Sequence, residues 1–200
     1  MNKQWHVLVI PYPGQGHVAP LLKLTTKIAE HGVKVTFVNT EFIEAKMMAS
    51  MLEKSEGWSL IKFVSILDEL EHGDIRKDFE KSRNTMIRVM PGKLKDLIEN
   101  INQSSDNEQI RCVISDVNAQ WGLKVAQKMG IPSAAFVTYG PTILAPQFHI
   151  TKLIEDGIID TNGNAIHDGL ISISEENLPW KANEFPWSFR GHEEVLMCMA

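Results

Sequence analysis

The chain has 200 residues, of which 44% are hydrophobic and 22% are charged. These proportions exclude a disordered or collagen-like chain, and the length suits one domain with a sizeable core. The formal net charge of −5 gives no support for a nucleic-acid partner, because phosphate binding needs clustered lysine and arginine. No apolar run approaches the roughly 20 residues of a transmembrane segment, so none is expected.

The cysteines and histidines predict neither a disulfide framework nor a metal site. Cys112 and Cys198 are the only cysteines, which fits a reducing compartment. The seven histidines show no paired ligand spacing, and two distant cysteines cannot form a zinc cage. The first apolar run, residues 5–10, is shorter than a signal-peptide core and meets two prolines directly afterwards. We therefore expect a cytoplasmic protein without a metal.

Short apolar segments alternate with helical patterns along most of the chain. Strands are predicted at 5–10, 33–38, 61–66, 111–115 and 133–138. Helices are predicted at 19–31, 41–52, 77–89, 91–101, 119–129 and 141–155. Because crossovers of a dozen or more residues join the strands, the sheet should be parallel. The pattern therefore predicts an α/β fold, with a Rossmann-like parallel sheet flanked by helices.

The periodicity fades after residue 156, where glycine, asparagine, aspartate and proline dominate. We expect residues 1–156 to form a Rossmann-like domain and residues 157–200 to form an irregular segment of the same domain.

Three polar residues follow three of the predicted strands. His17 lies in the loop after the first strand, Asp116 follows the fourth, and Thr138 follows the fifth. Ligands of parallel sheets bind beyond the carboxyl ends of the strands, near a switch in strand order. We therefore expect these three residues to converge on one edge of the sheet, although they are far apart in the chain.

His17 and Asp116 have the chemistry of a general base and its orienting carboxylate. The mouth of a helix disfavours an imidazolium, and a neutral imidazole can accept a proton. A carboxylate on the other ring nitrogen would fix the tautomer and stabilise the imidazolium formed during a reaction. The alternative is structural, with His17 capping a helix and Asp116 acting as an N-cap.

A rival reading is a dinucleotide-binding module. Gly14-x-Gly16-x-x-Ala19 fits the fingerprint G-x-G-x-x-G/A after a strand and before a helix. That fingerprint requires an acid at the end of the second strand to hold the ribose. Here Asn39 ends the strand and Glu41 follows two residues later, so the match is imperfect.

Two runs of sequence resemble the plant family-1 UDP-sugar glycosyltransferases, and within that family they most resemble the UGT83A-like group. They are HVLVIPYPGQGHVAPLLKLTTKIAEHGVKVTFVNTE and VISDVNAQWGLKVAQKMGIPSAAFVT. The resemblance implies the N-terminal, acceptor-binding half of an enzyme of GT-B fold. It implies that His17 is the catalytic base, that Asp116 orients it, and that Thr138 touches the donor sugar. It also places Gly14, Gln15 and Gly16 beside the diphosphate and the reacting centre.

The activity that this resemblance implies is inverting transfer of a sugar to a hydroxyl of a small lipophilic phenol or alcohol. The co-substrate would be a UDP-sugar, with UDP-glucose as the expected donor, and no other cofactor is implied. The sequence shows no second Rossmann-like half and no donor-binding signature. We therefore expect a fragment that is the acceptor-binding half of such an enzyme. The alternative is a truncated, non-catalytic family member, for which we expect no turnover.

Four residues are candidates for the apolar walls of an acceptor pocket, because small-molecule pockets are mostly apolar. They are Met90, Trp121, Tyr139 and Phe148. For each of them the structural alternative is strong, since a large apolar residue at helical spacing is commonly part of the core.

Overall fold

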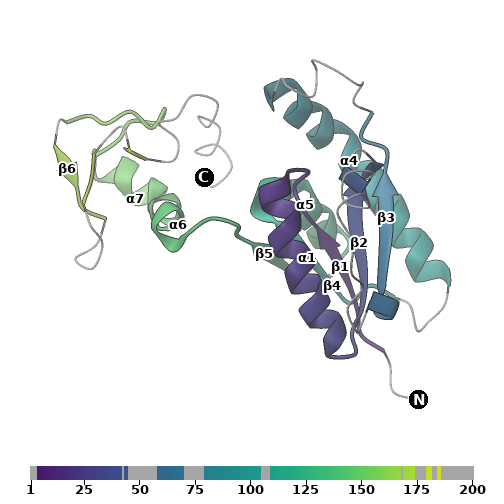
Figure 1. The fold of residues 1–200 in the computed structure, drawn as a ribbon. Coiled ribbons are helices and arrows are strands. Elements are labelled where there is room, and N and C mark those ends of the chain that lie inside the picture. Colours follow the sequence, from purple (N-terminus) through teal and green to yellow (C-terminus); the bar gives the residue numbers. More distant parts are fainter. Residues whose placement is uncertain are drawn as a thin grey trace. The chain divides into compact units, whose positions relative to one another are not determined.

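Five parallel strands form the central sheet of the first of two compact units, Met1–Thr138. In a computed structural model of the chain they run in the order β3-β2-β1-β4-β5 (Figure 1). Their bounds are β1 His6–Ile10, β2 Lys34–Thr40, β3 Ile61–Ile66, β4 Cys112–Asp116 and β5 Ser133–Phe136. The structure describes residues 4–41, 43–44, 58–69, 79–104, 109–167, 169–173, 179–181 and 184–185. The parallel α/β sheet confirms the predicted fold class.

The strand order reverses between β1 and β4. From β1 the chain crosses to β2 on one side, whereas β4 pairs with β1 on the other side. The register aligns Ile10 of β1 with Ser115 of β4, so the residues that follow both strands leave the sheet at the same point. Ligands of such sheets bind at this switch point, beyond the carboxyl ends of the strands.

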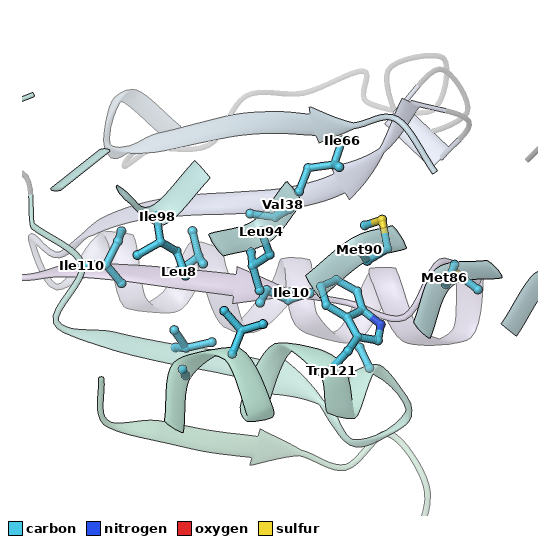
Figure 2. Packing of buried hydrophobic residues seen from close by; sticks show 14 residues of the cluster. Leu8, Ile10, Val38, Ile66, Met86, Met90, Leu94, Ile98, Ile110 and Trp121 are labelled. Atoms are coloured by element: carbon cyan, nitrogen blue, oxygen red, sulfur yellow. The ribbon is translucent and has the colours of Figure 1, made fainter. Parts of the chain in front are cut away.

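Helices cover both faces of the sheet. Alternate residues of each strand point to opposite faces, and the apolar residues of β1 on each face are buried beneath these helices. The helices of this unit are α1 Gln15–Glu30, α4 Phe79–Ser104 and α5 Gln120–Lys128, with the short 3-10 helices η1 Trp58–Leu60 and η2 Val117–Ala119. Val7 and Val9 of β1 pack in one buried cluster with Leu21 of α1. Leu8 and Ile10 pack in the other, with residues of α4 and α5 (Figure 2).

Helix α4 is continuous, which corrects the predicted pair of helices at 77–89 and 91–101. Pro91 lies inside it. A proline in a helix interior costs about 3 kcal/mol, because it removes one hydrogen bond and crowds the preceding turn. The stripe Met86, Met90, Leu94 and Ile98 runs past Pro91 on both sides and is buried along its whole length. Burial of this stripe outweighs the local cost.

Helix α1 begins at Gln15, four residues earlier than predicted. Gly14 is its N-cap, and the Gly14 carbonyl accepts hydrogen bonds from the amides of His17 and Val18, both at 2.9 Å. His17 therefore lies in the first turn of the helix rather than in the preceding loop. Gly32 and Gly130 follow α1 and α5 with φ angles of 79° and 68°. They provide the left-handed residue that commonly ends a helix.

The second unit, Tyr139–Ala200, has a small core of its own. It contains α6 Pro141–Phe148, α7 Ile150–Glu155 and the antiparallel pair β6 Leu170–Ile171 and β7 Trp180–Lys181. Its core consists of Ile150, Leu153, Ile159, Ile171 and Phe185. This boundary differs from the expected division at residues 156 and 157.

The single helix predicted at 141–155 is interrupted at His149. The amide of His149 bonds to the carbonyl of Pro146 at 3.0 Å, and its Nδ1 bonds to the carbonyl of Ala145 at 2.8 Å. The imidazole thus takes the place of the backbone donor that a continuous helix would offer to Ala145.

The expectations for a transmembrane segment, for the cysteines and for the helix at 41–52 can be compared only with the residues that the structure describes. Among the described residues, no helix combines the length and the apolar composition needed to cross a membrane. Cys112 has a free thiol, whose pKa is raised by burial, whereas Cys198 lies outside the described residues. Most of the helix predicted at 41–52 also lies outside them.

The buried stripe of α4 predicts a sharp contrast between two aliphatic positions on that helix. Leu94 is 0% exposed and Ile87 is 48% exposed. Leu94→Ala should lower the free energy of unfolding by about 2–5 kcal/mol, since it leaves a cavity in the core. Ile87→Ala, the matched control, should change it by less than about 0.5 kcal/mol. Urea denaturation of both variants measures the difference, and similar losses would contradict the described packing.

Candidate active site

His17 projects from the first turn of α1 at the carboxyl end of β1. Its side chain is 24% exposed, so one part of the ring is packed and another is reachable from solvent. A Cβ atom on Gly14 would lie 3.3 Å from Cδ2 of the imidazole. Glycine at this position therefore leaves room for the ring beside the helix N-terminus.

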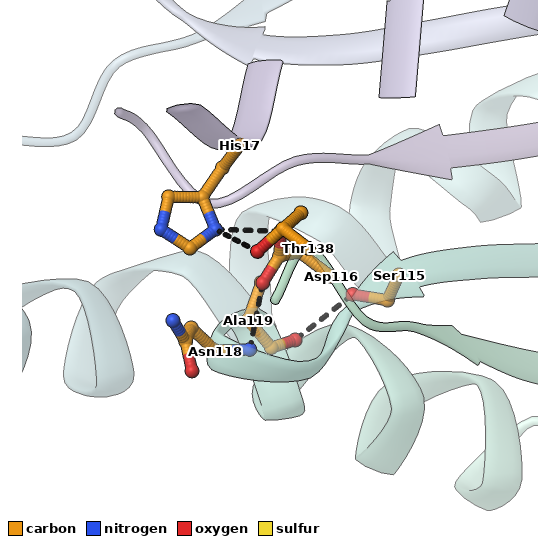
Figure 3. A network of polar contacts seen from close by, with 6 residues as sticks. All are labelled: His17, Ser115, Asp116, Asn118, Ala119 and Thr138. Carbon is orange, nitrogen blue, oxygen red and sulfur yellow. Dashed lines mark hydrogen bonds and ion pairs between the residues drawn. The ribbon is translucent and has the colours of Figure 1, made fainter. Parts of the chain in front are cut away.

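Asp116 holds the imidazole from the neighbouring strand. It is the last residue of β4 and is 0% exposed. Its Oδ2 lies 2.8 Å from Nδ1 of His17, and its Oδ1 accepts a hydrogen bond from the amide of Asn118, also at 2.8 Å (Figure 3). Asp116 is thus both the N-cap of η2 and the partner of His17, through separate oxygens. The expected N-cap role of Asp116 is therefore compatible with its contact to His17, whereas His17 does not cap α1, which has no side-chain cap.

The packing of α5 against the sheet supports the position of Asp116. The hydroxyl of Ser115 donates to the carbonyl of Ala119 at 2.9 Å. A Cβ atom on Gly122 would lie 2.6 Å from that hydroxyl oxygen and 2.9 Å from Cδ1 of Ile10. Gly122 therefore allows α5 to approach β4 closely at the residue that precedes Asp116.

Thr138 reaches the same imidazole from beyond the end of β5. Its Oγ1 lies 3.1 Å from Nδ1 of His17, the nitrogen that also faces Asp116 (Figure 3). The structure therefore brings together His17, Asp116 and Thr138, as their positions after three strands predict. The contact between Thr138 and the imidazole was not predicted, because the resemblance points only to the donor sugar.

The pairing with Asp116 selects one tautomer of His17. If Nδ1 carried a lone pair, that lone pair would face a carboxylate oxygen at 2.8 Å, so the proton belongs on Nδ1. In the neutral ring, Nε2 then carries the lone pair. Nε2 points away from Asp116 and Thr138 in Figure 3, and it has no hydrogen bond to any described residue. This nitrogen is available to accept a proton from a ligand.

Tyr12 is a neighbour of the pair that sequence reasoning missed. Its ring contacts the imidazole of His17 edge-on, with centroids 5.3 Å apart and an interplanar angle of 64°. Burial raises the pKa of the Tyr12 phenol, and the Asp116 carboxylate adds to this rise, whereas Arg83 opposes it. Tyr12 therefore remains a neutral, partly buried wall on one side of His17. Its place in the loop after β1 was the only signal in the sequence.

The residues proposed for the diphosphate lie at the start of α1. Gly14 is the N-cap, and Gln15 and Gly16 are the first helical residues and are exposed. The amides at a helix N-terminus carry partial positive charge and point outward. Their contact with a diphosphate stays a prediction.

The four candidates for the acceptor wall lie in different surroundings. Met90 and Trp121 are 2% and 6% exposed and belong to the core between the sheet and helices α4 and α5 (Figure 2). Tyr139 belongs to the second unit, where its hydroxyl donates to Oε1 of Gln147 at 2.7 Å. Phe148, in the same unit, is 70% exposed. Whether these residues touch an acceptor stays a prediction.

No metal centre is visible in the part of the chain that the structure describes. Within it, no three histidine, cysteine, aspartate or glutamate side chains are grouped so that they could hold an ion. Separately, the contact between Nδ1 of His17 and Oδ2 of Asp116 orients an imidazole in a way that suits proton transfer.

Asp116→Asn should reverse the tautomer of His17. The amide oxygen can still cap Asn118, and the amide nitrogen then donates to Nδ1, so the ring proton moves to Nε2. Nitrogen-15 NMR of labelled histidine, recorded where the ring is neutral, distinguishes the two tautomers. Asp160→Asn, a change at an exposed loop carboxylate of the second unit, is the control. An unchanged Nδ1–H tautomer in Asp116→Asn would contradict the geometry.

Curated relatives of the chain are plant glycosyltransferases. UDP-glycosyltransferase 83A1 of Arabidopsis thaliana is 34% identical over 187 residues, which cover 91% of this chain and 40% of the relative. The 7-deoxyloganetin glucosyltransferase of Catharanthus roseus is 30% identical over 162 residues, which cover 78% of this chain and 33% of the relative. The chain thus spans less than half the length of these relatives. No protein-family model matches the chain.

Solved structures with the same fold come from similar enzymes. Medicago truncatula UGT71G1 complexed with UDP-glucose has a TM-score of 0.73 and 19% identity, over 100% of this chain and 43% of the other. A UDP-glucose: anthocyanidin 3-O-glucosyltransferase in complex with UDP has a TM-score of 0.69 and 23% identity, over 98% and 44%. The fold is therefore that of one half of a GT-B protein. The chain is related to the plant UDP-glycosyltransferases and corresponds to the N-terminal half of these proteins.

Proposed function

We propose that this chain is the acceptor-binding half of a UDP-dependent glycosyltransferase and carries its catalytic base. One observation supports this most directly: the buried Asp116 carboxylate holds Nδ1 of His17 at 2.8 Å. This contact leaves Nε2 as a proton acceptor on a partly exposed ring at the switch point of the sheet. A histidine that only caps a helix has no need of a fully buried carboxylate.

In the proposed reaction, Nε2 of His17 removes the proton from an acceptor hydroxyl. The hydroxyl oxygen attacks the anomeric carbon of the sugar from the face opposite the diphosphate, so the configuration is inverted. The bond between the anomeric carbon and the diphosphate oxygen breaks, and UDP leaves with the electron pair. Asp116 stabilises the imidazolium through Nδ1–H. General-base assistance of this kind typically contributes roughly 10²–10⁴ in rate.

The proposed donor is a UDP-sugar, with glucose as the expected sugar and no further cofactor. The two similar solved structures described above contain UDP and UDP-glucose, which supports a UDP-sugar as the donor. The N-terminal end of α1, with Gly14, Gln15 and Gly16, would face the diphosphate, because its free amides suit an anion. Most contacts to the uridine would come from the part of such proteins that these 200 residues do not cover.

The proposed acceptor is a small lipophilic alcohol or phenol. Two relatives are named for glucosyl transfer to 7-deoxyloganetin and to (R)-mandelonitrile, both small molecules. Tyr12 beside His17 would form one wall next to the reacting hydroxyl. Met90, Trp121, Tyr139 and Phe148 are proposed as further walls.

The two alternatives have less support. A dinucleotide-binding module gives no role to the pair of His17 and Asp116. The last two residues of β2 are the buried Asn39 and Thr40, so the acid that this module expects is absent from the strand end, and Glu41 follows the strand. The relatives also favour a glycosyltransferase. A truncated, non-catalytic family member would keep the same pair without turnover. We propose that the protein is cytoplasmic, because the free thiol of Cys112 would stay reduced in that compartment.

His17→Ala tests the proposed base in a protein that also carries the UDP-sugar-binding half. Turnover, measured as UDP released from UDP-glucose with a lipophilic phenol, should fall by roughly 10²–10⁴ because the proton acceptor is lost. His31→Ala is the matched control, since His31 is the exposed C-cap residue of the same helix, at the end opposite His17. This variant should keep wild-type turnover.

The proposal would be wrong if His17→Ala retained near wild-type turnover while remaining folded. Binding measurements on the 200-residue chain distinguish the proposed glycosyltransferase half from a dinucleotide-binding module. Binding of NAD(P) without any response to UDP-glucose or to the phenol would favour the dinucleotide-binding module.

A further inference from the structure

Nδ1 of His17 faces two oxygen atoms but carries only one hydrogen. Oδ2 of Asp116 lies 2.8 Å away and Oγ1 of Thr138 lies 3.1 Å away (Figure 3). Because Asp116 fixes the proton on Nδ1, the Thr138 hydroxyl can only accept there. The single N–H is therefore shared between a strong acceptor and a weaker one.

The carboxylate cannot restrain the imidazole fully by itself. Its second oxygen, Oδ1, is held by the amide of Asn118 at 2.8 Å, so only Oδ2 serves His17. A single hydrogen bond leaves the ring free to swing about the line that joins its donor and acceptor. A second acceptor at the same hydrogen, displaced from that line, limits the swing.

Thr138 is well placed for this role. Phe136, the last residue of β5, is in register with Asp116 on β4, so the chain just beyond β5 passes the end of β4. The branched side chain of threonine has few χ1 states, which keeps its hydroxyl in place at little entropic cost. The contact joins residues 121 positions apart in the sequence.

We propose that Thr138 is a positioning residue for the base: its hydroxyl shares the Nδ1–H of His17 with Asp116 and so directs Nε2 at the acceptor. The catalytic meaning of this role rests on the proposed function, whereas the contact itself does not. The role differs from the donor-sugar contact implied by the resemblance. Both can coexist, because the Thr138 O–H remains free to donate while its oxygen accepts.

The first experiment needs no substrate and uses the 200-residue chain. The side-chain Nδ1–H resonance of His17 is followed by NMR, and its exchange with water is measured. In Thr138→Val, which keeps the shape but loses the acceptor, exchange should become roughly threefold to tenfold faster, the range expected for one hydrogen bond. Thr138→Ser keeps the hydroxyl and should restore slow exchange.

Thr25→Val is the matched control. Thr25 lies on the same helix as His17, is 0% exposed, and its hydroxyl has no hydrogen-bond partner among the described residues. This variant removes an isosteric buried hydroxyl without touching the imidazole, so exchange should stay at the wild-type rate. Unchanged exchange in Thr138→Val would overturn the proposal. An equal acceleration in Thr25→Val and Thr138→Val would also overturn it, because the effect would then be a general loss of stability.

A second experiment separates positioning from sugar binding in a protein that carries the UDP-sugar-binding half. Positioning predicts that Thr138→Val lowers kcat and leaves the KM for UDP-glucose within about twofold, because the base is misaligned in the transition state. A raised KM with unchanged kcat would overturn the positioning role and leave only a sugar contact. If turnover is absent even in the wild type, the proposed function fails, and the exchange measurement still decides the role of Thr138.

Discussion

The account depends on one hydrogen bond, from Nδ1–H of His17 to the buried Oδ2 of Asp116. A buried carboxylate is costly unless its oxygens are hydrogen-bonded, and both oxygens of Asp116 are satisfied, one by His17 and one by Asn118. The imidazole N–H therefore satisfies the buried carboxylate, and the carboxylate in turn fixes the position of the imidazole proton. This mutual requirement fixes the proton on Nδ1 and leaves the lone pair on Nε2, the atom that we propose as the base.

The sheet places this bond where a ligand can reach it. The order β3-β2-β1-β4-β5 sets the end of β1 beside the end of β4, so a first-turn residue of α1 meets the last residue of β4. Small residues make the approach possible, since Gly14 leaves space for the ring and Gly122 lets α5 close on Ser115. The proposed chemistry follows from this topology rather than from any local sequence motif alone.

Sequence reasoning could predict the parallel sheet and the convergence of His17, Asp116 and Thr138, because the side-chain period and the rule for strand ends are local or topological. It could not predict that Thr138 would bond to the imidazole, which depends on the register between β4 and β5. It placed a helix break at Pro91 because proline is unfavourable inside a helix. In the structure the helix continues, because the apolar residues on both sides of Pro91 are buried in the core. Tyr12 was missed because a ring contact leaves no periodic pattern.

A double-mutant cycle on turnover tests most directly whether His17 and Asp116 act as one unit. His17→Ala, Asp116→Asn and the double variant would be compared in a protein that carries both halves. Groups that act through each other are strongly non-additive, so the double variant should be no slower than the slower single variant. Losses that multiply in the double variant would show independent roles and would contradict the account.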